Sequence, residues 1–79
     1  MRERVRIAFG LPGAARVRLE VIDLMGRAIA SLADGELPAG TFAMDWDGRV
    51  GGRRVPTGMY FVRLEVDDRR LVRRLVVTR

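Results

Sequence analysis

The chain has 79 residues, of which 48% are hydrophobic, and it carries a formal net charge of +5. This length fits one domain with a thin core, because so short a chain buries only about 60–65% of the surface that it exposes when unfolded. Cysteine and histidine are both absent, which excludes disulfides, thiolate metal sites and an imidazole acting as general base or metal ligand. No apolar run approaches the roughly 20 residues that span a bilayer, and the first residues do not resemble a signal peptide.

Alternation of apolar with polar or small residues is the main pattern along the chain. Val5, Ile7 and Phe9 show it first, with arginine or alanine between them. A period of two places one set of side chains on a core face and the other toward solvent, as a half-buried strand requires. The strands predicted in this way cover residues 3–10, 16–23, 28–33, 40–46, 58–66 and 69–78.

Two of these segments need a choice between interpretations. Residues 28–33 also have helical spacing, but Gly26 and Gly35 flank them so closely that we predict a strand. In residues 69–78, apolar side chains occur at positions of both parities. That pattern indicates a strand partly covered on both faces, or a strand whose covering neighbour is missing.

Glycine, proline and aspartate separate the strands. Residues 23–27 form a predicted tight turn in which Gly26 supplies a positive φ. We expect a short loop between Asp34-Gly35 and Gly40, and an irregular segment over residues 47–58. Turn residues at intervals of about 8–12 residues predict a sandwich or barrel. We therefore expect residues 1–79 to form one all-β domain, an immunoglobulin-like antiparallel β-sandwich of about six to seven strands.

The carboxylates are the first candidates for catalytic or metal-binding groups. Asp45 and Asp47 are two residues apart, a spacing that could serve glycoside hydrolysis, but we favour a turn in which Asp47 accepts backbone N–H bonds. A calcium loop of the EF-hand type starting at Asp45 fails, because its twelfth residue is Pro56 instead of glutamate. Ser31 has no histidine partner. We predict no catalytic, metal-binding or cofactor-binding residue, and therefore no enzyme and no cofactor.

Arginine accounts for all 15 basic residues, since the chain has no lysine. Nucleic-acid-binding proteins usually gather such charge and add exposed aromatic side chains for stacking. Here arginines and carboxylates are interleaved at solvent-facing positions, so we expect cross-strand ion pairs and no nucleic-acid partner. The arginines are Arg4, Arg6, Arg16, Arg18 and Arg63, and the carboxylates are Glu3, Glu20, Glu65 and Asp67.

One dense arginine cluster stands out, in the last predicted strand. One interpretation is an interaction surface for phosphate, an anionic lipid headgroup or an acidic protein. The other is an edge strand that its charges protect from aggregation, and we favour this second interpretation. The cluster consists of Arg69, Arg70, Arg73 and Arg74.

The few aromatic residues divide by parity. Trp46 falls on the same side of its strand as Phe42 and Met44, so we predict that it anchors the core. Tyr60 lies at an inward position of its strand, where a buried ring with its hydroxyl at the rim is typical. Phe61 has the opposite parity and is the better candidate for an exposed contact.

Short motifs follow one another in order over nearly the whole chain. They are VRIAFGLP at residues 5–12, VIDLMGR at 21–27, LPAG at 37–40, WDGR at 46–49, GRRVPTGMYFVRL at 52–64 and RLVVTR at 74–79. Together they resemble the immunoglobulin-like domain named after the flagellar hook-capping protein FlgD, and the related C-terminal sorting domain of the type IX secretion system. Two departures are Val50, where the family often has aspartate, and the missing Asn-Pro lead-in before the first strand.

The resemblance implies a non-enzymatic C-terminal module of a secreted or outer-surface protein. In type IX cargo such a domain is an address that the secretion machinery reads; elsewhere it is a structural domain that contacts neighbouring domains of the parent protein. A sorting signal should lie in residues 58–79. The alternative is a binding module that holds an acidic polysaccharide, a lipid headgroup or a protein, through one sheet face with Arg4, Arg6, Arg16 and Arg18 or through the dense cluster. The motif residues expected to support the fold are Asp23, Gly26, Trp46, Asp47, Gly48, Pro56, Gly58 and Tyr60.

Overall fold

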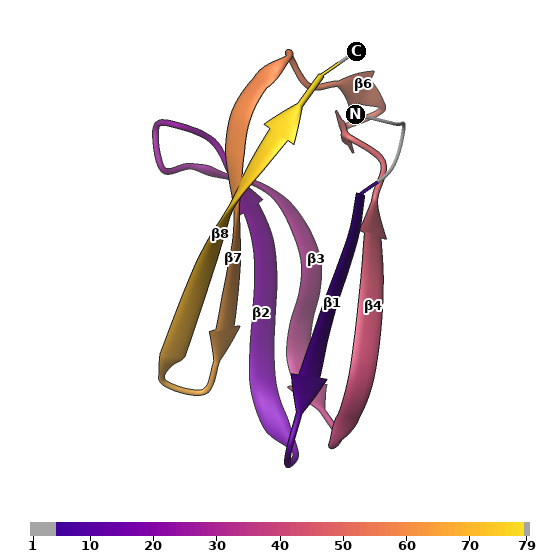
Figure 1. The fold of residues 1–79 in the computed structure, drawn as a ribbon, viewed down its shortest axis with the longest axis vertical. Helices are drawn as coiled ribbons and strands as arrows, with labels where there is room; N and C mark the ends of the chain where they lie inside the picture. The colour runs from indigo at the N-terminus through magenta and orange to yellow at the C-terminus, as the bar shows by residue number, and fades with distance from the viewer. Residues whose placement is uncertain (1–4, 79) are drawn as a thin grey trace.

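The computed structural model describes residues 5–78, and its regular structure there consists of eight β-strands (Figure 1). The predicted all-β class is therefore confirmed. The expected six to seven strands were too few, because the segment 47–58 contains a hairpin of two short strands. The strands are β1 (Val5–Leu11), β2 (Ala15–Ile22), β3 (Ala28–Leu37), β4 (Gly40–Trp46), β5 (Arg49–Val50), β6 (Arg53–Arg54), β7 (Gly58–Val66) and β8 (Arg69–Val77).

The strands form an antiparallel β-sandwich. The larger sheet has four strands in the order β3-β2-β7-β8, and the smaller pairs β1 with β4. β1 and β2 follow each other in the chain but belong to different sheets, as do β3 and β4, so the chain passes repeatedly between the two layers. β5 and β6 form a separate hairpin in the connection from β4 to β7.

The core lies between the two sheets, and β2 contributes most to it. Val17, Leu19 and Val21 are completely buried, and they alternate with outward-facing residues along the strand. This is the period of two that the sequence predicted, set on a strand with neighbours on both sides. At one end of the sandwich, Trp46 and Tyr60 pack with Val21, Val55 and Val77 in a single buried cluster.

The third strand is longer than predicted, because it continues through the Asp34-Gly35 pair that was expected to begin a loop. Its ladder with β2 contains two register shifts, which leave Ile29 and Leu32 without a directly opposed residue. Such bulges turn side chains away from strict alternation. Both side chains pack against the core, and their spacing of three residues, which looked helical in the sequence, follows from the two bulges.

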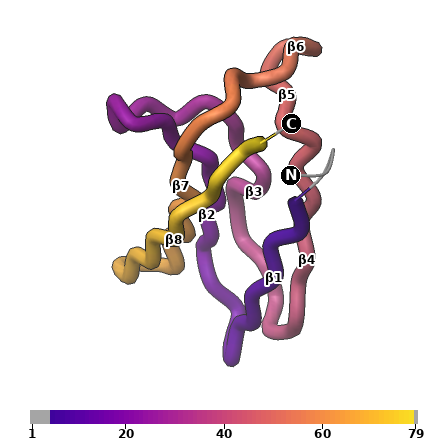
Figure 2. Tube along the Cα trace, turned by 45° about the horizontal axis from the view of Figure 1, so that its top comes forward, coloured from indigo at the N-terminus to yellow at the C-terminus, as the bar shows by residue number. Residues whose placement is uncertain are grey.

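The smaller sheet covers only part of the larger one. In two views it lies toward β3, whereas β7 and β8 extend away from it on the other side (Figures 1 and 2). β8 forms one edge of the larger sheet, and in the described part of the chain β1 has a hydrogen-bonded neighbour only in β4. The sandwich is therefore half open along the side between β1 and β8.

Candidate functional site

The turn between β2 and β3 is held by one carboxylate. Asp23 Oδ1 accepts hydrogen bonds from the backbone N–H groups of Met25 and Arg27, both at 2.9 Å, and Oδ2 accepts one from Arg27 Nε at 3.0 Å. The bond from the Arg27 N–H, the Arg27 guanidinium and the bond from Met25 together keep the pKa of Asp23 below its ordinary value. Gly26 has φ 84°, a conformation that side chains with a Cβ disfavour. Asp23 and Gly26 are thus turn residues, as predicted.

The WDGR motif forms a second supported turn. Asp47 Oδ1 accepts a 3.0 Å hydrogen bond from the Arg49 N–H, which confirms the turn interpretation of this carboxylate. Trp46, which is only 3% exposed, donates its indole N–H to the Arg49 carbonyl at 3.2 Å. The Gly48 carbonyl, on a residue with φ 74°, accepts a bond from the Val55 N–H. These bonds attach the β5–β6 hairpin to the buried tryptophan.

A side-chain hydrogen bond also stabilises the bend that leads into β7. Tyr60 is buried, and its hydroxyl donates a 2.6 Å hydrogen bond to the Pro56 carbonyl. Its ring meets the Trp46 ring edge-on, with 6.4 Å between centroids and 66° between planes. A tyrosine near the start of a strand that bonds back to the upstream backbone is the tyrosine corner of immunoglobulin-like sandwiches. Gly58 begins β7 and pairs with Val77 of β8.

Four further carboxylates among residues 5–78 form cross-strand ion pairs, as the interleaved charges predicted, whereas Asp67 accepts a hydrogen bond from the Arg16 N–H. The shortest joins Glu20 to Arg63 at 2.7 Å, with both side chains mostly buried. The bond to Glu20 also raises the pKa of Arg63. Within residues 5–78 no group of three or more aspartate or glutamate side chains could hold a metal ion. The other pairs are Arg6–Asp45, Arg16–Asp34, Arg18–Glu65 and Arg70–Glu65.

The prediction that Arg6, Arg16 and Arg18 share one sheet face is wrong. Arg6 lies on the outer surface of the smaller sheet, whereas Arg16 and Arg18 lie on the outer surface of the larger one. The reason is that β1 pairs with β4 instead of β2, which places consecutive strands in opposite layers. Arg4 lies outside the described residues.

The dense arginine cluster is also divided between two faces. In an antiparallel ladder, directly opposed residues share a face. Arg69 is opposite Val66 and Arg73 is opposite Val62, so both project from the inner face. Arg70 and Arg74 project outward, and Arg70 pairs with Glu65 at 2.9 Å. β8 is an edge strand, as the favoured interpretation of the cluster requires.

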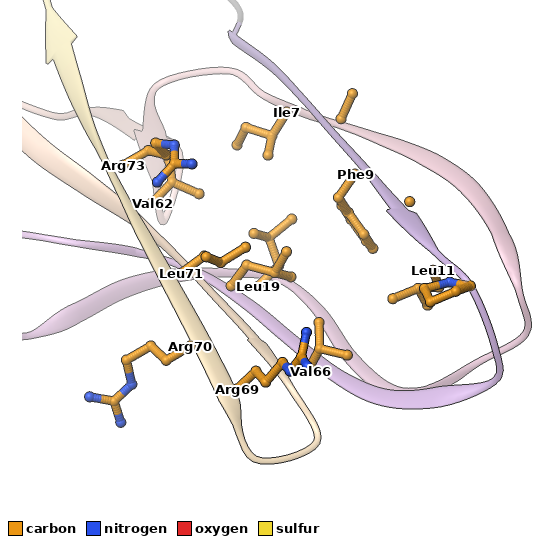
Figure 3. A pocket seen from close by; sticks show the side chains of 14 residues that line it. Ile7, Phe9, Leu11, Leu19, Val62, Val66, Arg69, Arg70, Leu71 and Arg73 are labelled. Carbon is orange, nitrogen blue, oxygen red and sulfur yellow. The ribbon is translucent and has the colours of Figure 1, made fainter.

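The feature that sequence reasoning missed is a groove of about 640 Å³ between the open edges of the sandwich (Figure 3). One wall comes from β1 and the other from β8, and the floor is formed by inward side chains of β2 and β7. The sequence contained one indication of it, the apolar residues of both parities in β8. Its apolar lining includes Ile7, Phe9, Leu19, Val62, Leu64 and Leu71, and the edge strand adds Arg69 and Arg73.

Comparison with protein-family models, with curated proteins and with solved structures gives no match for this chain. The resemblance to the FlgD-type and type IX sorting domains therefore stays a prediction from the motifs. In the described part of the chain, no helix has the length and apolar character needed to cross a membrane.

Proposed function

We propose that the chain is a non-catalytic immunoglobulin-like module of a secreted or outer-surface protein, acting as a sorting domain of the type IX kind or as its structural counterpart. The observation that carries this proposal is how the motif carboxylates are used. Asp23 and Asp47 accept backbone hydrogen bonds in turns. Glu20 of β2 forms an ion pair with Arg63 of β7. Carboxylates used in this way stabilise turns and sheet pairing, which supports the role of a scaffold.

The terminal hairpin supports the sorting role. β8 is an edge strand and exposes apolar side chains on its outer face, with Val72 44% and Val76 51% exposed. A recognition machine can reach both the free backbone groups and these side chains without unfolding the domain. The hairpin lies within residues 58–79, the part of the chain where the resemblance implies that the signal is read.

A fusion experiment tests the sorting role. Residues 1–79 are fused to the C-terminus of a periplasmic reporter in a bacterium that has a type IX system, and surface-exposed reporter is measured by protease accessibility on intact cells. We expect the fusion to reach the surface and the Val72→Glu, Val76→Glu double variant to stay in the periplasm. The control is Leu24→Glu, in an exposed turn outside the hairpin. Retention of the unmodified fusion in the periplasm would contradict the sorting role.

A second candidate is a module that binds an acidic polysaccharide or another anionic partner. It is favoured by Arg69, Arg73 and Arg74, for which no ion-pair partner exists among residues 5–78. Binding to an immobilised acidic polysaccharide should then weaken steeply with salt and disappear in the Arg73→Glu, Arg74→Glu variant. Retention that does not respond to salt or to these substitutions would exclude this candidate.

A further inference from the structure

Two unpaired strand edges face each other across the groove. Among residues 5–78, β1 is bonded only to β4, and β8 only to β7, so each has a row of backbone N–H and C=O groups without a strand partner there on the groove side. Such an edge is a template for another extended chain, which can satisfy those groups by continuing the ladder. The first requirement for binding a strand is therefore present on both walls.

The groove between these edges is lined by apolar side chains, of which Ile7, Phe9 and Leu64 are partly exposed, whereas Leu19 is fully buried. Val62 of β7 and Leu19 of β2 line the groove, and Ile7 and Phe9 face them from β1 (Figure 3). Leu64 of β7 also lines it. Leu71 on β8 is 54% exposed although its position opposite Leu64 belongs to the inner face. In a closed sandwich these side chains would be covered by a further strand of the opposing sheet. An apolar side chain entering here would remove this surface from water.

The rim of the groove is positively charged. Arg69 and Arg73 occupy inner-face positions of β8, and in Figure 3 Arg73 lies beside Val62. Arg70 also lines the groove, but its guanidinium is paired with Glu65. Neither Arg69 nor Arg73 has a carboxylate at ion-pair distance among the described residues, and Arg73 Nη1 donates only to the Val72 carbonyl. The two guanidinium groups are thus available for acidic side chains.

These three features point to one occupant. We propose that the groove accepts an extended segment of a partner polypeptide that adds to the edge of β1, with apolar side chains turned toward the floor and carboxylates beside Arg69 and Arg73. The two arginines are four residues apart on a strand, so carboxylates at the same spacing on the incoming strand match them. A second copy of this chain fits poorly, because pairing β8 with β8 would set arginines against arginines. This binding role does not depend on the sorting proposal.

A synthetic peptide tests the proposal on the full chain. The probe has the 9-residue length of β8 and alternates valine with glutamate. We expect saturable binding by calorimetry, and newly slowed amide exchange along β1 in NMR spectra. Two control peptides separate the contributions. Lysine in place of glutamate removes the charge match, and N-methylation of alternate backbone amides removes the ladder hydrogen bonds while keeping every side chain.

Matched arginine variants locate the site. Charge reversal removes one attraction and adds a repulsion, so Arg73→Glu should weaken binding of the glutamate peptide by about tenfold. Arg74→Glu is the control, since it changes the same charge on the same strand but on the outer face. Thermal unfolding of both variants, followed by the fluorescence of Trp46, verifies that they are folded.

The peptide and variant measurements together test whether a strand adds in the groove. Tight binding of the glutamate peptide, lost with N-methylation and weakened by Arg73→Glu but not by Arg74→Glu, supports strand addition in the groove. Equal binding of the lysine peptide, equal effects of the two arginine variants, or no binding overturns the proposal. A concentration-dependent dimer in sedimentation that Leu71→Glu abolishes would also overturn it, because the occupant would then be a second copy.

Discussion

At the scale of single residues, two carboxylates, Asp23 and Asp47, stabilise turns by accepting backbone hydrogen bonds. Asp23 is the clearest case, because three donors from the next four residues converge on its two oxygens. The motif alone was enough to predict a turn here, since aspartate and glycine at this spacing have a local reason to form one. The convergence of Arg27 on Asp23 was not predicted, because it depends on a rotamer that only the folded hairpin selects.

Replacing Asp23 with asparagine tests the charge at this turn. The pKa of Asp23 is lowered in the folded state, so its charge stabilises the fold above its unfolded pKa of about 3.9, and this contribution is lost as the pH falls through the folded pKa. We expect Asp23→Asn to be less stable than the wild type in urea denaturation at pH 7. The difference should shrink as the pH falls below about 3.9 toward the lowered pKa of folded Asp23, where the carboxyl becomes protonated. A difference that is the same at both pH values would contradict this account.

Tyr60→Phe tests the tyrosine corner. The substitution removes the 2.6 Å bond to the Pro56 carbonyl but keeps the ring against Trp46. The free energy of unfolding should fall by about 1 kcal/mol, the usual net value of such a bond. Denaturant titration measures the loss, and an unchanged emission maximum of the folded-state Trp46 verifies that the ring packing is preserved. No loss of stability would mean that the hydroxyl is equally well satisfied by water.

At the scale of elements, local patterns predicted where strands occur but not where they are irregular. The sequence predicted that Val17, Leu19 and Val21 face the core, because buried and outward residues alternate along β2 without interruption. The inward positions of β3 could not be predicted in this way, because two bulges interrupt its alternation. The bulges depend on the pairing of β3 with β2, which the periodicity of one segment does not reveal. The β5–β6 hairpin was missed for a similar reason, since two-residue strands have no period to detect.

The glycine of the β2–β3 turn provides a prediction about an element junction. Gly26 has φ 84°, so Gly26→Ala should destabilise the fold by about 1 kcal/mol through backbone strain. Gly13→Ala is the matched control, because Gly13 also has open space around its Cβ position but no positive φ. It should be neutral or slightly stabilising. Denaturant midpoints of the two variants measure the contrast, and equal effects would remove the strain argument.

At the scale of the whole molecule, the unequal width of the two sheets determines what the surface offers. A sheet of two strands cannot cover one of four, and the uncovered part coincides with the groove between β1 and β8. The sequence predicted the sandwich, but it did not predict this imbalance, because sheet membership is decided by long-range pairing. The one local indication of the imbalance was that β8 has apolar residues at positions of both parities. Leu71 lines the groove, whereas Val72 and Val76 are exposed on the outer face.

The half-open sandwich requires that the outer edges of β1 and β8 have no strand partner among the described residues. Hydrogen exchange of the monomeric chain, followed by NMR, tests this most directly. β2 lies between β3 and β7, so its amides should exchange slowly apart from those next to the bulges. Along β8, every second amide faces no strand partner and should exchange rapidly, while those bonded to β7 stay protected. β1 should show the same alternation against β4. Uniformly slow exchange along β8 and β1 would show that both edges are already occupied and would contradict the half-open sandwich.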